Sequence, residues 1–134
     1  MLLNANLDLA LCDFGGSRNN VYDGNGLPDY GFFDPRDDSI DVTEETEIFG
    51  LGSSLYTIMT GHLPHGASMP NTTTAGLAYV EHFKSMLHRD ELPDTSNLTG
   101  GEIIKKCWMH GAISAEEVYL QYLRLERQSQ REAS

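Results

Sequence analysis

The chain has 134 residues, of which 40% are hydrophobic and 22% are charged, and its formal net charge is −11 at pH 7. These proportions are ordinary for a single globular domain and exclude a disordered chain. Such a negative charge argues against a protein that binds nucleic acid or an anionic membrane, because both need a basic surface. No apolar run approaches the ~20 residues of a membrane span, and the first residues lack the features of a secretory signal. We therefore expect an intracellular, cytoplasmic protein.

The first residues predict a short β-hairpin. Two apolar runs, residues 1–3 and 7–12, flank the turn-prone sequence Asn-Ala-Asn. In the second run leucines alternate with Asp8 and Ala10, which is typical of a half-buried strand. Cys12 at its end and Cys107 further along both lie in apolar runs, so we expect two buried free thiols rather than a disulfide.

A long irregular segment follows, from residue 13 to about residue 41, rich in Gly, Asn, Asp and Pro. Loops of this length in compact domains usually have a function.

The next stretch predicts two helices. Thr43 is a plausible N-cap for the first, which Gly61 ends, and its apolar residues recur at helical spacing. A second amphipathic segment extends from about residue 75 to residue 88. The expected buried residues are Ile48, Phe49, Leu51, Leu55, Ile58 and Met59 in the first helix and Leu77, Val80, Phe83 and Leu87 in the second.

Two further helices complete a four-helix core. A short one, about residues 101–109, groups Ile103, Ile104, Cys107 and Trp108. The last begins at a capping box, Ser114 to Glu117. Its expected inward residues are Val118, Tyr119, Tyr122 and Leu123. After about residue 126 the sequence is polar, so residues 128–134 are expected to form a frayed tail.

Several motifs occur in the order found in protein kinases. Asp13-Phe14-Gly15 follows the second strand directly, and Phe-Asp-Pro-Arg at 33–36 resembles the family's A-P-E motif. Glu-Ile-Phe-Gly-Leu-Gly at 47–52, followed by Leu-Tyr-Thr-Ile-Met-Thr-Gly at 55–61, is similar to the large central helix. Cys-Trp at 107–108 and Ser-Ala-Glu-Glu-Val at 114–118 are similar to the closing segment. Residues 1–127 thus resemble the C-terminal lobe of a protein kinase catalytic domain, from the D-F-G motif onward.

The resemblance implies phosphoryl transfer from ATP, with Mg²⁺, to Ser/Thr or Tyr hydroxyls of a protein substrate. It implies that Asp13 is the metal ligand, and that Phe14 and Gly15 complete the D-F-G motif. Ser17, Tyr22 and Tyr30 lie in the segment that matches the activation loop, and are candidate phosphoacceptors.

The family's glycine-rich loop, phosphate-pairing lysine and catalytic aspartate are not among these 134 residues. We assign no catalytic residue, and expect this chain alone neither to bind ATP nor to transfer phosphate. Whether it belongs to an enzyme stays open. The alternative is a non-catalytic, pseudokinase-type module that binds a partner protein. Apolar helix surfaces that the rest of a kinase would cover are expected to be exposed and to favour self-association.

Three positions depart from the family pattern. Arg36 stands where the family has the glutamate of A-P-E, and residues 109–113 contain no arginine to match that glutamate's usual partner. We therefore expect this ion pair to be lost as a whole, which leaves no buried charge unpaired. Glu47 replaces the aspartate that begins the central helix, and its role is open.

Overall fold

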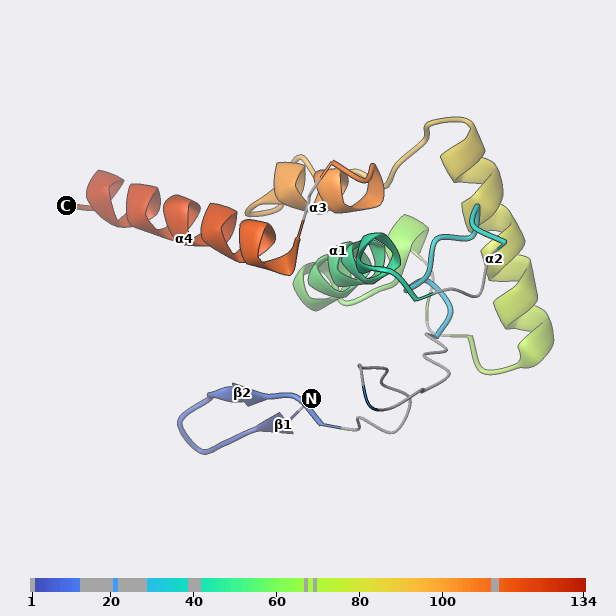
Figure 1. Ribbon diagram of the computed structural model, residues 1–134, viewed down its shortest axis with the longest axis horizontal. Helices are drawn as coiled ribbons and strands as arrows, with labels where there is room; N and C mark the ends of the chain where they lie inside the picture. The colour runs from blue at the N-terminus through green and yellow to red at the C-terminus, as the bar shows by residue number, and fades with distance from the viewer. Residues whose placement is uncertain are drawn as a thin grey trace.

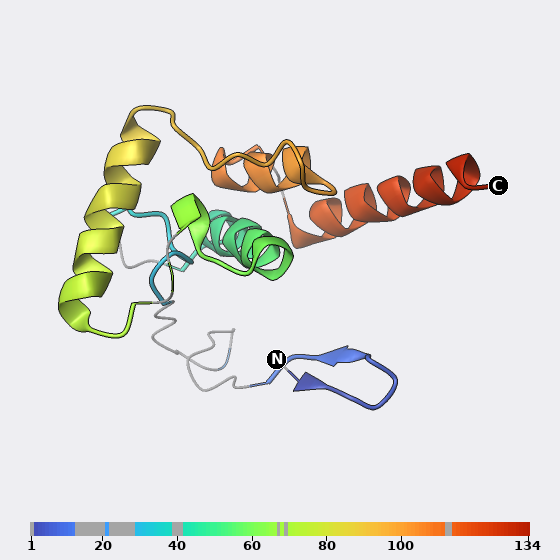
Figure 2. The ribbon, with the colours of Figure 1, turned by 180° about the vertical axis from the view of Figure 1, so that it is seen from behind.

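The computed structural model describes residues 2–12, 21, 29–38, 42–66, 68, 70–111 and 114–134. Over these residues the chain is mainly helical, with four α-helices and one two-stranded hairpin. In Figures 1 and 2, α1 lies centrally, next to α3 and with α2 to one side, α4 projects away from them, and the hairpin lies apart from the helices. The elements are β1 (Leu2–Leu3), β2 (Leu9–Ala10), α1 (Glu44–Thr60), the 3₁₀ helix η1 (Pro64–Gly66), α2 (Thr73–His88), α3 (Gly101–Trp108) and α4 (Ala115–Glu132).

The hairpin is confirmed, although its strands are shorter than expected. Leu2 lies opposite Ala10 and Leu3 opposite Leu9 in an antiparallel pair. The side chain of Asn4 closes the turn, because its Oδ1 accepts hydrogen bonds from the backbone N–H groups of Asn6 and Asp8, each at 2.9 Å. The expected half-buried strand is wrong, since every residue from 2 to 12 is exposed, Cys12 included. Alternation predicts which face would be covered, but no described element covers it.

Helix α1 begins and ends where the sequence predicts. The hydroxyl of Thr43 accepts from the N–H of Thr46 at 3.2 Å, and the hydroxyl of Thr46 accepts from the N–H of Thr43 at 2.9 Å. Gly61 ends the helix in the left-handed conformation, with φ of 80°. This reciprocal capping satisfies donors that the first turn of a helix otherwise leaves unpaired.

The buried face of α1 differs from the expected apolar stripe. Ile48 and Phe49 are buried as expected, and Leu51 and Leu55 are half-buried, but Ile58 is 63% exposed and Met59 is exposed too. The buried face includes instead Gly52, Ser53 and Tyr56. A pattern of apolar residues does not predict that glycine and serine are buried, yet these small residues allow a neighbouring helix to approach closely.

That neighbour is α3. A Cβ atom placed on Gly52 would lie only 2.6 Å from the Cβ of Cys107, so glycine is what permits this close crossing. Trp108 is fully buried, and its indole N–H donates to the Ser53 hydroxyl at 2.9 Å. The four residues predicted to group on α3 are all buried, which confirms that expectation.

Helix α2 buries most of the predicted face. Phe83 and Leu87 are buried and Val80 is half-buried against the core, whereas Leu77 is 58% exposed. Gly76 and Tyr79, which the apolar pattern did not include, are buried too. The Tyr79 hydroxyl donates to the Pro64 carbonyl at 3.2 Å, which joins α2 to η1.

Helix α4 starts at the predicted cap, where the Ser114 hydroxyl accepts from the N–H of Glu117 at 3.1 Å. It buries Val118 alone, while Tyr122 and Leu123 are half-buried, and Tyr119, expected to face inward, is exposed. The helix continues to Glu132, through most of the residues expected to fray. Its last turns hold Arg, Gln and Glu, which are good helix formers.

Candidate functional site

Most of the site residues that the sequence suggests lie outside the described residues. These are Asp13, Phe14, Gly15, Ser17 and Tyr22. Their proposed roles as metal ligand, D-F-G motif and phosphoacceptors therefore remain predictions.

Tyr30 is the one candidate phosphoacceptor that the structure describes. It is half-buried, and its ring packs against α2 at Gly76, where a Cβ atom would lie 2.3 Å from the Tyr30 Cε2. Tyr30 also contacts the hydrophobic core that contains Phe49, Tyr79 and Trp108. Besides being a candidate for modification, Tyr30 thus helps to hold its loop on the helices.

Four polar side chains form a connected group that we call the loop anchor and define as Asp34, Arg36, His110 and Glu45. The guanidinium of Arg36 donates to both carboxylate oxygens of Asp34, each at 2.8 Å, and to the carbonyl oxygen of Trp108 at 3.1 Å. One ring nitrogen of His110 lies 3.1 Å from Asp34 Oδ2, and the other lies 3.2 Å from Glu45 Oε1. The loop anchor therefore joins the loop before α1, the first turn of α1 and the end of α3.

Electrostatics explains why the Asp34 carboxylate stays charged although its side chain is only 5% exposed. Burial by itself raises its pKa, but hydrogen bonds from Arg36, the charge of Arg36 and the contact with His110 outweigh it, so the pKa of Asp34 is lowered. The same hydrogen bonds raise the pKa of Arg36. Held by Arg36 and His110, the Asp34 carboxylate ties its loop to the segment that follows α3.

The loop anchor provides a contact between the two segments that was not predicted from the sequence. Arg36 pairs with Asp34 within its own loop, and Asp34 contacts His110 in the segment after α3. The two segments thus stay connected through Asp34 and His110. The signal that could have revealed this contact was His110, whose ring nitrogens can form hydrogen bonds to a carboxylate.

The described residues contain no group of three or more His, Cys, Asp or Glu side chains that could hold a metal ion.

Glu47, whose role the sequence left open, is exposed at the start of α1. Within the described part of the chain, no helix has the length and apolar character needed to cross a membrane.

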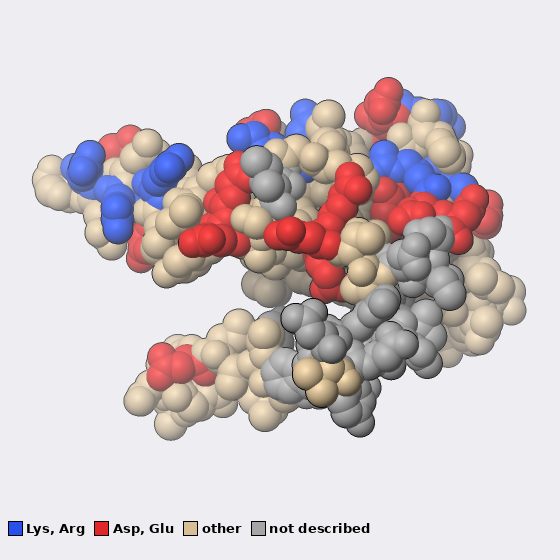
Figure 3. All heavy atoms as spheres, in the orientation of Figure 1, with Lys and Arg blue, Asp and Glu red and all other residues tan. Residues whose placement is uncertain are grey.

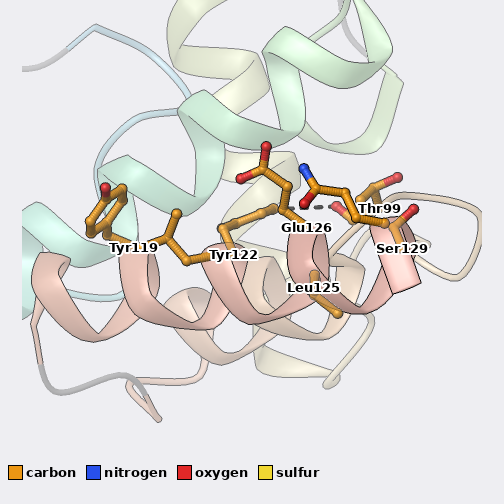
Figure 4. A pocket seen from close by; sticks show the side chains of 8 residues that line it. Thr99, Tyr119, Tyr122, Leu125, Glu126 and Ser129 are labelled. Atoms are coloured by element: carbon orange, nitrogen blue, oxygen red, sulfur yellow. Dashed lines mark hydrogen bonds between the residues drawn. The ribbon is translucent and has the colours of Figure 1, made fainter. Parts of the chain in front are cut away.

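A shallow groove of about 490 Å³ runs beside α4 (Figure 4). Tyr119, Tyr122, Leu125, Glu126 and Ser129 of α4 line it together with Thr99, whose carbonyl accepts a long hydrogen bond of 3.4 Å from the Tyr122 hydroxyl. Burial raises the pKa of Tyr122, with a smaller contribution from Cys107. Glu126 is the one formally charged side chain in its lining, which otherwise consists of tyrosines, leucines and uncharged polar residues.

Comparison of the chain with models of protein families, with curated proteins and with solved structures finds no match in any of the three. Functional inference therefore depends on the residues and contacts described above.

Proposed function

We propose that the chain forms the C-terminal lobe of a protein-kinase-like domain, and that these 134 residues alone do not transfer phosphate. In a complete domain of this kind the reaction would be transfer of the ATP γ-phosphate to a protein hydroxyl. Asp13 would then bind Mg²⁺, and residues 13–36 would form the activation segment. We propose an intracellular location for such a protein.

One observation carries the proposal: residues 34–36 contact the end of α3 across more than 70 residues of sequence. Arg36 donates to the carbonyl of Trp108, and Asp34 contacts His110. The kinase resemblance places these two segments side by side, since the family joins them by an ion pair, and here other residues make the contact although both members of that pair are replaced. The central position of α1, the helix that matches the family's large central helix, also supports the proposal.

The test begins with the transcript, read upstream of the Met1 codon. We expect the reading frame to continue through a catalytic loop and a glycine-rich loop, and the longer product to phosphorylate a generic protein substrate. Asp13→Asn in that product should lower the rate at least about 100-fold, because the metal clamp on the phosphates is weakened.

The matched control is Asp38→Asn, because Asp38 is a loop carboxylate whose side chain is 92% exposed. This change should leave the rate unaltered. Phosphate transfer by the pure 134-residue chain, or an Asp13→Asn variant of the longer product with full activity, would contradict the proposal.

A second candidate function is a non-catalytic module that binds a protein partner. It is favoured by the exposed leucines of the hairpin and by the exposed Ile58 and Leu77 on the helices. A transcript that begins at Met1, or a longer product that neither binds Mg·ATP nor transfers phosphate, would favour this module over the kinase.

A further inference from the structure

A histidine in η1 is held against α2 as an uncharged aromatic ring. The ring of His65 makes edge-on contacts with the rings of Phe83 and His82, at centroid distances of 5.4 and 6.2 Å. Its Nε2 atom is buried and has no hydrogen-bond partner among the described residues. A protonated ring could not remain in this position without a large cost, because a buried positive N–H group needs an acceptor.

The backbone at this histidine is in an unfavourable conformation. His65 has φ of 63° and ψ of 25°, in the left-handed region that residues other than glycine seldom occupy. Such a conformation persists only where surrounding contacts hold it. The contacts here are the ring packing on Phe83 and the hydrogen bond from the Tyr79 hydroxyl to the Pro64 carbonyl at 3.2 Å. Loss of the ring packing would therefore allow η1 to move away from α2.

Packing, and not the charge of the surroundings, keeps His65 neutral. Among the described residues, burial lowers the pKa of His65 most, His82 lowers it further, and Glu91 raises it. Burial also raises the pKa of Tyr79, the other titratable residue of α2 next to η1, which stays uncharged. Acidic residues gather over the helices in Figure 3, and the formal net charge is −11. A histidine exposed to solvent in this negative field takes up a proton readily.

The loop before α1 rests on the same region. A Cβ atom placed on Gly31 would lie 3.1 Å from the Tyr79 hydroxyl oxygen and 3.4 Å from Leu63 Cδ2, so the Gly31 backbone contacts both side chains. Leu63 is buried and comes directly before η1. Movement of η1 away from α2 would therefore disturb the attachment of this loop, including the neighbouring Tyr30.

We propose that η1 is a pH switch: below about pH 6 His65 takes up a proton, η1 separates from α2, and the loop at residues 30–32 is released. Backbone strain at His65 and repulsion from a protonated His82 both favour the separated state. Because the folded pKa of His65 lies below its ordinary value of 6.5, the packed state is fully stabilised above that value. This stabilisation is lost as the pH falls from 6.5 through the lower folded pKa. The switch is independent of the kinase resemblance.

Two-dimensional NMR of the 134-residue chain between pH 7.5 and pH 5 tests the switch, because it follows histidine rings and backbone amides together. We expect the His65 ring to titrate below its ordinary value of 6.5, and the amide signals of Gly31 and Leu63 to shift in step with it. The amide signal of Ile103, which lies in α3, should not follow this titration. A His65 ring that titrates while the signals of Gly31 and Leu63 stay unchanged would overturn the proposal.

His65→Asn removes the titrating ring and suits the left-handed backbone, which asparagine tolerates. In this variant the signals of Gly31 and Leu63 should no longer shift between pH 7.5 and pH 5. Urea denaturation should show that the ratio of folded to unfolded chain falls at least about threefold less over this interval than in the unaltered chain. The matched control is His88→Asn, which changes an exposed histidine at the end of α2 and should leave both responses as they are in the unaltered chain.

A second variant, His82→Gln, keeps the His65 ring and backbone and removes the neighbouring charge. The His65 ring should then titrate at a higher pH than in the unaltered chain, because the repulsion between the two rings is lost. Shifts of Gly31 and Leu63 that persist in His65→Asn would contradict the switch. An unchanged titration of His65 in His82→Gln would contradict it too, since the two rings would then not be in contact.

Discussion

The helical core and the hairpin are both rich in apolar residues, yet they differ completely in burial. Phe49 of α1 and Trp108 of α3 are fully buried in the helical core, whereas the hairpin leucines are mostly exposed. The core residues have opposing surfaces that fit them, including the small Gly52 and Ser53, and the leucines have none within the described residues. An apolar pattern thus specifies which residues could be buried, while burial itself depends on a complementary partner.

Truncation of side chains should separate the two regions most clearly. Trp108→Ala removes a fully buried ring and the hydrogen bond to Ser53, so it should lower the free energy of unfolding by about 3 to 5 kcal/mol. Leu9→Ala removes a largely exposed side chain and should cost less than about 0.5 kcal/mol in the monomer. Urea denaturation at low protein concentration measures both values. Similar costs for the two variants would mean that the hairpin is packed as firmly as the core.

The two cysteines provide a second probe of the same difference, without mutation. Cys12 is exposed, whereas Cys107 is buried against Gly52 and burial raises its pKa to about 11. Because the thiolate is the reactive form and must reach solvent, Cys107 should react with a thiol reagent at least about 100-fold more slowly than Cys12. In urea the two rates should converge. Equal rates in the native state would show that α1 and α3 are not closely packed.

Disrupting the loop anchor should lower the free energy of unfolding by less than Trp108→Ala does. Asp34→Ala leaves the half-buried Arg36 guanidinium without its two hydrogen bonds to the carboxylate, and we expect a loss of about 2 to 3 kcal/mol. The control is Asp38→Ala, which removes a longer contact of 3.6 Å to Lys84 at an exposed position and should cost less than about 0.5 kcal/mol. Chemical denaturation at pH 7 distinguishes them.

The same carboxylate should make stability depend on pH. The pKa of Asp34 is lower in the folded chain than its ordinary value of 3.8, so the unfolded chain binds a proton more readily. Its contribution is therefore present above the ordinary value and is lost as the pH falls from about 4 through the lower folded pKa. The free energy of unfolding should decrease between pH 5 and pH 3 in both proteins, and the decrease should be smaller in Asp34→Asn than in the unaltered chain. An equal loss in both would assign the acid sensitivity to other groups.

Local features of the fold could be predicted from the sequence. Thr43, Gly61 and Ser114 mark helix ends because each acts on backbone groups within a few residues of itself. The buried faces of α1 and α2 were predicted less well. Gly52 and Gly76 are buried because another element rests on them, and no apolar pattern records such a contact.

In the candidate site, too, contacts between residues far apart in the sequence could not be predicted. The charge reversal at Arg36 was visible in the sequence, but its partner within the loop and the contact of Asp34 with His110, 76 residues away, depend on tertiary structure. The D-F-G residues remain a prediction from resemblance, since Asp13, Phe14 and Gly15 lie outside the described residues.

The close crossing at Gly52 also has an evolutionary consequence. Since a Cβ atom there would lie 2.6 Å from the Cβ of Cys107, any side chain at position 52 forces the two helices apart. Substitutions at positions 52 and 107 are therefore not independent, and a descendant could enlarge residue 52 only after α3 had moved. A larger residue at position 52 therefore requires a shift of the backbone of α1 or α3 and not only a change of side chain.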